Sequence, residues 1–349
     1  MSLTLYVDTE RFRAHLRSVH ERHPALVPVA KVNGYGLTNG RLALETRELG
    51  VDTLAVGTYD ELGKVTGRFD GDVVVLTPWR PFGAALTVDP NERVIHTIGR
   101  LEDLRGLLHQ DPTARFVLER MTSMLRHGFS ARDLRATAPI IAKYPGSIVE
   151  GVSVHLPLGS ASHVSEMHRL MTDVVAAGLD TRTVWVSHLS ASELAALATS
   201  YSDFTFRPRI GTDLWLGARD ALRVKATVLD AHSVERGDVF GYRSRTAPKS
   251  GTILVVSGGT AHGIGLEAPT GDSSVKARAA TLARGGLDAA GFVRSPYSID
   301  GKQRLFAEPP HMQASMLFLP TGAEVPKIGD EVDVRVRFTA TTFDRIEFS

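Results

Sequence analysis

Residues Val27–Leu37 read VPVAKVNGYGL and place a lysine where a short apolar run ends and a glycine-rich turn begins. Val27–Ala30 has the length and composition of a buried strand. An apolar strand end desolvates the amine of Lys31 and lowers its pKa, so that part of the amine is a neutral nucleophile near pH 7. Tyr35 follows four residues later, and its flanking glycines let the backbone curl closely around a bound group. The stretch predicts a strand ending on a lysine suited to Schiff-base formation; a surface lysine at a strand end is the alternative.

On the C-terminal side of this strand, short apolar runs alternate with longer amphipathic segments as far as Arg209. Eight such strand–helix units predict an α/β fold of the (β/α)₈ barrel type, with an open doubly wound sheet as the structural alternative. The predicted strands are Val27–Ala30, Leu54–Val56, Val73–Leu76, Val94–His96, Arg115–Leu118, Gly151–His155, Val184–Val186 and Thr205–Arg209. The predicted helices include Arg41–Leu49, Leu101–Leu108, Ala131–Ala142, Val164–Ala177 and Ser192–Ala198.

After about Ala221 the pattern changes to β-like runs separated by turns that contain glycine and proline. We therefore predict two domains, a barrel at residues 1–220 and a β-rich domain at residues 221–349. Leu3–Tyr6 is a strand-like lead-in that could pair with the second domain. Arg278–Ala283 is a helical exception without a clear role. The β-like runs are Val224–Leu229, Thr252–Ser257, Gln313–Leu319 and Val332–Thr339.

The composition is that of a soluble globular protein, with 43% hydrophobic and 23% charged residues among 349. A net charge of +1 gives no electrostatic reason to expect nucleic acid or an acidic membrane surface. No apolar run reaches the roughly 18 residues that cross a bilayer, so we predict no membrane partner and a cytoplasmic location. The absence of cysteine excludes disulfides and thiolate chemistry. The thirteen histidines show no metal-ligand spacing, and we predict no metal site.

The lysine motif resembles that of the alanine racemases, fold-type III enzymes that depend on pyridoxal 5'-phosphate (PLP). In that family a lysine is followed at the same spacing by a tyrosine–glycine pair. The resemblance implies that PLP is the cofactor, that Lys31 holds it covalently, and that Tyr35 contacts it.

Arg207–Gly217, RPRIGTDLWLG, resembles the family segment R-x-G-x-x-x-[YW] that leaves the eighth strand. The resemblance implies that Arg209 faces the pyridine nitrogen of the cofactor, while Gly211 and Thr212 donate to its phosphate. Backbone amides at the start of a helical turn attract a phosphate, which agrees with this role. An arginine that neutralises a nearby surface aspartate is the alternative.

Three further positions of the barrel match family motifs by resemblance. Arg126, in MTSMLRHGF, matches the arginine that hydrogen-bonds the cofactor and the substrate carboxylate. Glu119 stands where the family often carries a carbamylated lysine, and as an anion it could orient Arg126. His155 matches a histidine near the cofactor ring, or is a satisfied buried histidine. Ser190, in SHLSASE, matches a phosphate-binding serine, and its spacing to Glu193 also fits a helix N-cap.

Two residues of the β-rich domain complete the predicted site by the same resemblance. Tyr242, in DVFGYR, takes the position of the second catalytic residue, or is an aromatic packed on a hairpin. Met312, in HMQASMLFL, takes a substrate-site position, with Gln313 replacing the usual aspartate. The resemblance is weaker in this domain than in the first 220 residues.

Together these matches imply PLP-dependent racemisation of a small amino acid, with alanine favoured, by a homodimer with shared active sites. Lys31 and Tyr242 would be the two catalytic bases, acting on opposite faces of the substrate. Two alternatives stay open. One is a fold-type III decarboxylase, although such enzymes usually carry a catalytic cysteine that this chain lacks. The other is a PLP-binding homologue without turnover, in a carrier or regulatory role.

Overall fold

The computed structural model describes residues 2–88, 93–159, 162–266 and 293–349. The chain divides into two compact units, Arg13–Gly217 and a β-rich unit that combines Met1–Phe12 with Ala218–Ser349. The sequence indicated a boundary at residue 220 and Leu3–Tyr6 was included in the first range, although this strand-like segment could also pair with the second domain. In the structure that strand, β1 (Leu3–Val7), belongs to the β-rich unit, because its backbone pairs with strands there.

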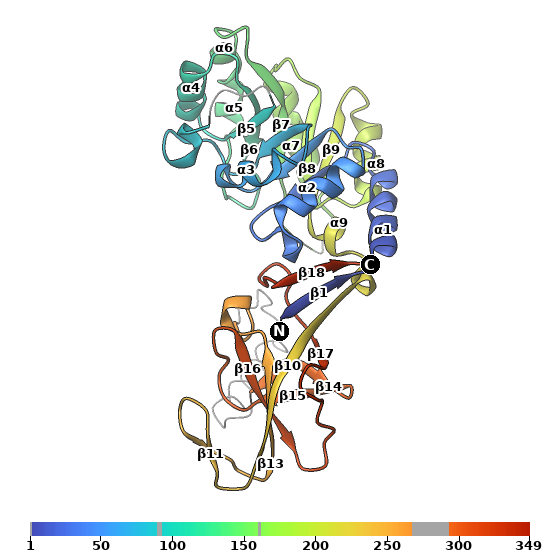
Figure 1. Cartoon of the computed structure of the whole chain (residues 1–349). Helices are drawn as coiled ribbons and strands as arrows, with labels where there is room; N and C mark the ends of the chain where they lie inside the picture. The colour runs from blue at the N-terminus through green and yellow to red at the C-terminus, as the bar shows by residue number, and fades with distance from the viewer. Residues whose placement is uncertain (1, 89–92, 160–161, 267–292) are drawn as a thin grey trace. The chain divides into compact units, whose positions relative to one another are not determined.

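In the first unit, eight parallel strands close into a barrel in chain order, which confirms the predicted fold and excludes the open sheet. The closing pair is β2 with β9, where Val27 lies opposite Arg209. Helices surround the strands (Figure 1). The barrel strands are β2 (Val27–Ala30), β3 (Thr53–Val56), β4 (Asp72–Val75), β5 (Val94–Ile98), β6 (Arg115–Arg120), β7 (Ile148–His155), β8 (Thr183–Ser187) and β9 (Thr205–Ile210).

The strands are rich in valine and isoleucine because each is covered on both sides, by the barrel interior and by helices. A central apolar cluster includes Val27, Val29 and Trp185, all nearly inaccessible to solvent. Within the described residues, the α-helices are α1 (Thr9–Arg22), α2 (Asn39–Glu48), α3 (Leu62–Val65), α4 (Leu101–Gln110), α5 (Ala131–Arg135), α6 (Ala138–Ile141), α7 (Val164–Ala176), α8 (Ala191–Ser200) and α9 (Thr212–Leu216).

One predicted helix differs from the structure. The segment Ala131–Ala142 forms two short helices, α5 and α6, with a break at Thr137. Pro139 lies in the first turn of α6. Proline has no backbone N–H to donate and its ring clashes with the preceding turn, so it starts a new helix rather than continuing α5. The helical pattern at Arg278–Ala283 lies outside the described residues.

The second unit is built on an eight-stranded sheet of order β13-β16-β15-β14-β17-β10-β1-β18, with a separate hairpin, β11-β12. β1 runs antiparallel to β10 and parallel to β18, beside both in Figure 1. The strands are β10 (Leu222–Val234), β11 (Val239–Phe240), β12 (Arg245–Thr246), β13 (Gly251–Ser257), β14 (Arg294–Ile299), β15 (Lys302–Phe306), β16 (Ala314–Pro320), β17 (Glu331–Val334) and β18 (Arg345–Phe348).

Candidate functional site

A cavity of about 330 Å³ opens where the carboxyl ends of the barrel strands meet. Parallel strands present all their carboxyl ends at one rim, so residues far apart in sequence converge there. The cavity brings together seven of the predicted site residues: Lys31, Tyr35, Arg126, His155, Arg209, Gly211 and Thr212.

Lys31 follows the last residue of β2 and lines this cavity. Its pKa is lowered, first by desolvation of the amine and next by the positive charge of Arg126. Glu61 acts in the opposite direction, because its carboxylate favours the charged amine. The net lowering increases the fraction of neutral amine, which is the nucleophilic form.

Glu61 also holds the backbone on both sides of the lysine pocket. Its carboxylate accepts hydrogen bonds from the backbone amides of Val32 (2.6 Å) and Gly57 (2.7 Å). Val32 has a positive φ of 57°, a conformation that is costly for a β-branched residue. We infer that Glu61 stabilises the turn that carries Lys31. Sequence reasoning missed this residue, although a capping-box spacing from Thr58 to Glu61 was a visible signal.

Tyr35 and the segment after β9 meet in the same cavity. Tyr35 is buried with a φ of 55°, and its hydroxyl is hydrogen-bonded to the side chain of Thr212. Burial raises the pKa of Tyr35 to about 12, so it is a neutral hydrogen-bonding group. A Cβ at Gly211 would collide with the Tyr35 hydroxyl, so this position requires glycine.

Arg209 is buried beneath the cavity, paired with an acid. Its guanidinium donates to the hydroxyl of Ser153 (2.8 Å) and to the carbonyl of Val154 (3.1 Å), and lies 3.8 Å from the carboxylate of Glu119. Desolvation lowers the pKa of Arg209, and Glu119 opposes this effect. The Nε atom is buried and has no hydrogen-bond partner among the described residues. Arg209, a residue that lines the cavity, thus has one buried N–H donor that is not satisfied within the described residues.

The structure corrects the expected role of Glu119. The sequence expectation was that this carboxylate orients Arg126. Instead, it accepts a hydrogen bond from Ser153 and pairs with Arg209. The reason is topological: Glu119 on β6 and Arg209 on β9 both extend into the barrel interior, whereas Arg126 lies in the exposed loop after β6.

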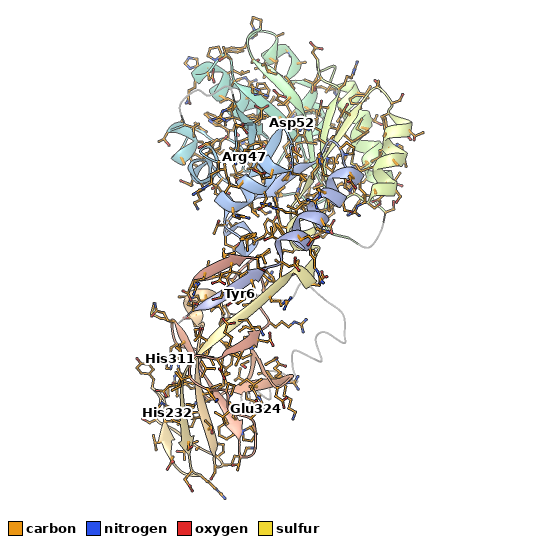
Figure 2. The ribbon with its side chains drawn as sticks, turned by 45° about the vertical axis from the view of Figure 1, so that its right-hand side comes forward. Tyr6, Arg47, Asp52, His232, His311 and Glu324 are labelled. Carbon is orange, nitrogen blue, oxygen red and sulfur yellow. The ribbon has the colours of Figure 1, made fainter. Side chains whose placement is uncertain are left out.

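We expect Glu119→Ala to lower the free energy of unfolding by about 3 kcal/mol, because it leaves the buried guanidinium of Arg209 without its counter-charge. Glu119 is 3% exposed, which makes the effect large. Urea unfolding followed by circular dichroism measures it. Glu48→Ala is the control, since Glu48 is exposed and forms only a surface ion pair at 3.5 Å with Arg47, one of the residues labelled in Figure 2. Equal destabilisation by both variants would contradict a special role for the buried pair.

Two histidines border the cavity on the β7–β8 side. His155 accepts or donates one hydrogen bond through Nδ1 with Ser187 (3.0 Å), and its ring stacks edge-to-face on His188. Burial, followed by the charges of Arg209 and Arg126, lowers the pKa of His155 to about 3. His155 is therefore a neutral imidazole at physiological pH. Ser187 and His188 were not predicted as site residues, although both lie where β8 ends.

Arg126 and Ser190 differ in their placement. Arg126 is exposed and lines the cavity, after Leu125, which has a positive φ of 53°. Ser190 does not line the described cavity and caps α8. Its hydroxyl accepts from the amide of Glu193, whose carboxylate accepts from the amide of Ser190. Of the two roles considered for Ser190, the contacts within the structure are those of a helix N-cap.

Tyr242 and Met312 belong to the β-rich unit. Both side chains are highly exposed, Tyr242 at 86% and Met312 at 72%. No helix among the described residues is long and apolar enough to cross a membrane, and within the same ranges no group of three or more acidic or histidine side chains could hold a metal ion.

Comparisons with known proteins agree with this geometry. Residues 7–218 match the family model described as "Alanine racemase, N-terminal domain". The chain is 27% identical over 286 residues to an alanine racemase of Lawsonia intracellularis, covering 75% of each chain. It is 26% identical over 276 residues to an alanine racemase of Nitratidesulfovibrio vulgaris, covering 71% of this chain and 72% of the relative.

Solved structures share the fold over nearly the whole chain. Alanine racemase from Bartonella henselae, with covalently bound pyridoxal phosphate, superimposes with a TM-score of 0.71 at 18% identity, covering 96% of this chain and 91% of that one. Histidine racemase from Leuconostoc mesenteroides gives a TM-score of 0.66 at 18% identity, covering 95% and 87%. Proteins named for different substrates therefore share this architecture.

Proposed function

This chain belongs to the alanine racemase family, whose members are PLP-dependent amino-acid racemases, and from that premise we propose that it racemises alanine as a homodimer with shared active sites. The observation that carries the proposal is the convergence of Lys31, Arg126 and Arg209 on one cavity at the barrel rim. A lysine with a lowered pKa beside two arginines suits a ligand that carries a carbonyl group, with which the amine can form a Schiff base, together with anionic groups.

The residues around the cavity fit PLP. Lys31 offers an amine with a lowered pKa for covalent attachment. The unpartnered, buried Nε of Arg209 is a donor suited to the pyridine nitrogen, which is an acceptor when unprotonated. Gly211 and Thr212 lie beside the Tyr35 hydroxyl, and a group of polar donors of this kind suits a phosphate. His155, neutral because of its low pKa, can contact the ring without adding charge.

The proposed mechanism uses two bases. When bound, PLP supplies an electron sink that stabilises negative charge at the substrate α-carbon. Lys31 removes or returns the α-proton on one face, and Tyr242 does so on the opposite face, because inversion requires transfer across the plane of the α-carbon. Arg126, permanently cationic at the mouth of the cavity, holds the substrate carboxylate. Buried Arg209, fixed by Ser153 and Glu119, holds its position without reorganising during the reaction.

A heavy-water assay tests the proposal. Purified protein with PLP is incubated in heavy water with a panel of L-amino acids that includes alanine and histidine. Deuterium at the α-carbon together with both enantiomers establishes racemisation and names the substrate. Deuterium incorporation without inversion contradicts two-base racemisation. No exchange with any amino acid, despite PLP binding, supports instead a PLP-binding homologue without turnover.

We predict that complementary inactive chains restore activity when mixed. Lys31 and Tyr242 come from different units of the chain, and the proposal brings them together from two subunits. Lys31→Ala and Tyr242→Phe chains are combined under conditions that exchange subunits, and activity is followed by chiral analysis of the product. Each heterodimer should contain one intact site. Failure to recover activity despite exchange proven by native mass spectrometry would contradict shared sites.

A further inference from the structure

We propose that His311, held by Glu308, is a positioning residue that keeps Tyr242 ready to act as a base; this inference rests on the catalytic role proposed above for Tyr242. All three residues lie in the β-rich unit, so their contacts are internal to it. His311 immediately precedes Met312, which the resemblance places in the substrate site.

The first step of the argument is how Tyr242 is presented. It lies in the tight turn between β11 and β12, which is closed by a hydrogen bond from the amide of Ser244 to the carbonyl of Gly241 (3.3 Å). Gly241 has a φ of 73°, and a Cβ there would collide with the Glu308 carboxylate. The same carboxylate accepts from the amide of Tyr242 (3.2 Å). The turn that carries Tyr242 therefore packs against the Glu308 carboxylate and is hydrogen-bonded to it.

The second step is the position of His311. Its Nε2 atom lies 2.6 Å from Oε1 of Glu308, and Glu308 is only 2% exposed. This hydrogen bond fixes the orientation of the imidazole ring. The rings of His311 and Tyr242 are in edge-to-face contact, with centroids 4.8 Å apart and planes at 73°. The Glu308 carboxylate therefore binds both the backbone amide of Tyr242 and the His311 ring that packs on the Tyr242 side chain.

The chemistry follows from this contact. To accept the α-proton of the substrate, Tyr242 must first be a phenolate, and the proton then moves from the α-carbon to the phenolate oxygen. The edge-to-face packing of His311 limits the rotation of an otherwise exposed side chain and so holds the phenolic oxygen in one orientation. His311 should therefore assist the tyrosine-side proton transfer and leave the lysine-side transfer unchanged.

The experiment measures α-deuterium exchange in heavy water from each enantiomer separately, with alanine or the amino acid that the panel identifies. By resemblance to the family, Lys31 is expected to act on the D-enantiomer and Tyr242 on the L-enantiomer. We expect His311→Gln, which keeps a donor toward Glu308 but removes the ring that packs on Tyr242, to slow exchange of the L-enantiomer about 10- to 100-fold. Exchange of the D-enantiomer should keep its wild-type rate. His311→Asn serves as a second variant if the first does not fold.

Two controls distinguish a specific effect of His311 on Tyr242 from a general structural effect. His232 is an exposed histidine of the same unit, 3.3 Å from Asp230, and Figure 2 labels it together with His311. His232→Gln should leave both exchange rates unchanged. In a Tyr242→Phe background, His311→Gln should have no further effect on L-exchange, because residues that act through one another are not additive.

The outcomes separate this inference from the proposed function. If the wild-type protein exchanges the α-proton, and His311→Gln exchanges it at the same rates as His232→Gln, the role of His311 is overturned while the proposed function stands. Equal slowing of both enantiomers, or further slowing in the Tyr242→Phe background, also overturns that role, since each indicates a general structural effect. A wild-type protein that exchanges no α-proton overturns the proposed function and this inference with it.

Discussion

Replacing Lys31 with alanine is expected to abolish racemisation, with a loss of about 10⁴- to 10⁶-fold in rate. One side chain serves both as covalent attachment for PLP and as a base, so its removal eliminates two functions together. The wild-type protein should be yellow, and borohydride should bleach this colour by fixing the cofactor to the chain. Lys31→Ala should lose the adduct while the barrel stays folded, because Lys31 lies at the cavity and outside the apolar cluster.

The matched control is Lys64→Ala. Lys64 is an exposed lysine on α3 in the same unit, and its removal should change neither the colour nor the rate. Peptide mapping of the reduced protein by mass spectrometry checks the site of attachment. An adduct on a lysine other than Lys31 would overturn the assignment of the catalytic lysine.

The second large effect is expected for Tyr242→Phe, and it should depend on the direction of the reaction. Loss of a positioned base costs about 10²- to 10⁴-fold. The L-enantiomer should lose α-deuterium exchange by this factor, whereas Lys31 alone should still exchange the D-enantiomer. PLP binding should not change, because Tyr242 belongs to the β-rich unit and Lys31 to the barrel.

Tyr6→Phe is the control for this prediction. Tyr6 lies in β1 of the same unit and donates a hydrogen bond to Glu331 (2.8 Å), so the variant removes one phenolic hydroxyl away from the proposed chemistry. Both of its exchange rates should match the wild type. Normal racemisation by Tyr242→Phe would mean that Tyr242 is a structural aromatic and that another residue of the chain acts on the second face.

Much of the barrel site followed from the sequence alone. Alternating strands and helices predicted the barrel, and a barrel brings every strand's carboxyl end to one rim. The predicted fold therefore places Lys31 after β2, His155 at the end of β7 and Arg209 near the end of β9 at the same rim, and all three line the cavity. Local patterns sufficed here because alternating strands and helices imply parallel strands. Parallel strands in a barrel have all their carboxyl ends at the same rim.

Other features depended on tertiary structure. The partner of Glu119 was Arg209 rather than Arg126, because two side chains on non-adjacent strands meet only inside the closed barrel. The sequence indicated that Leu3–Tyr6 could pair with the second domain, but its partner strands, β10 and β18, and their directions were defined only by the folded chain. The contacts of Glu61 with Val32 and of Glu308 with Tyr242 likewise join separate segments. Residue periodicity reports which face of an element is buried, whereas the partner of a buried charge depends on side-chain directions that only the folded chain defines.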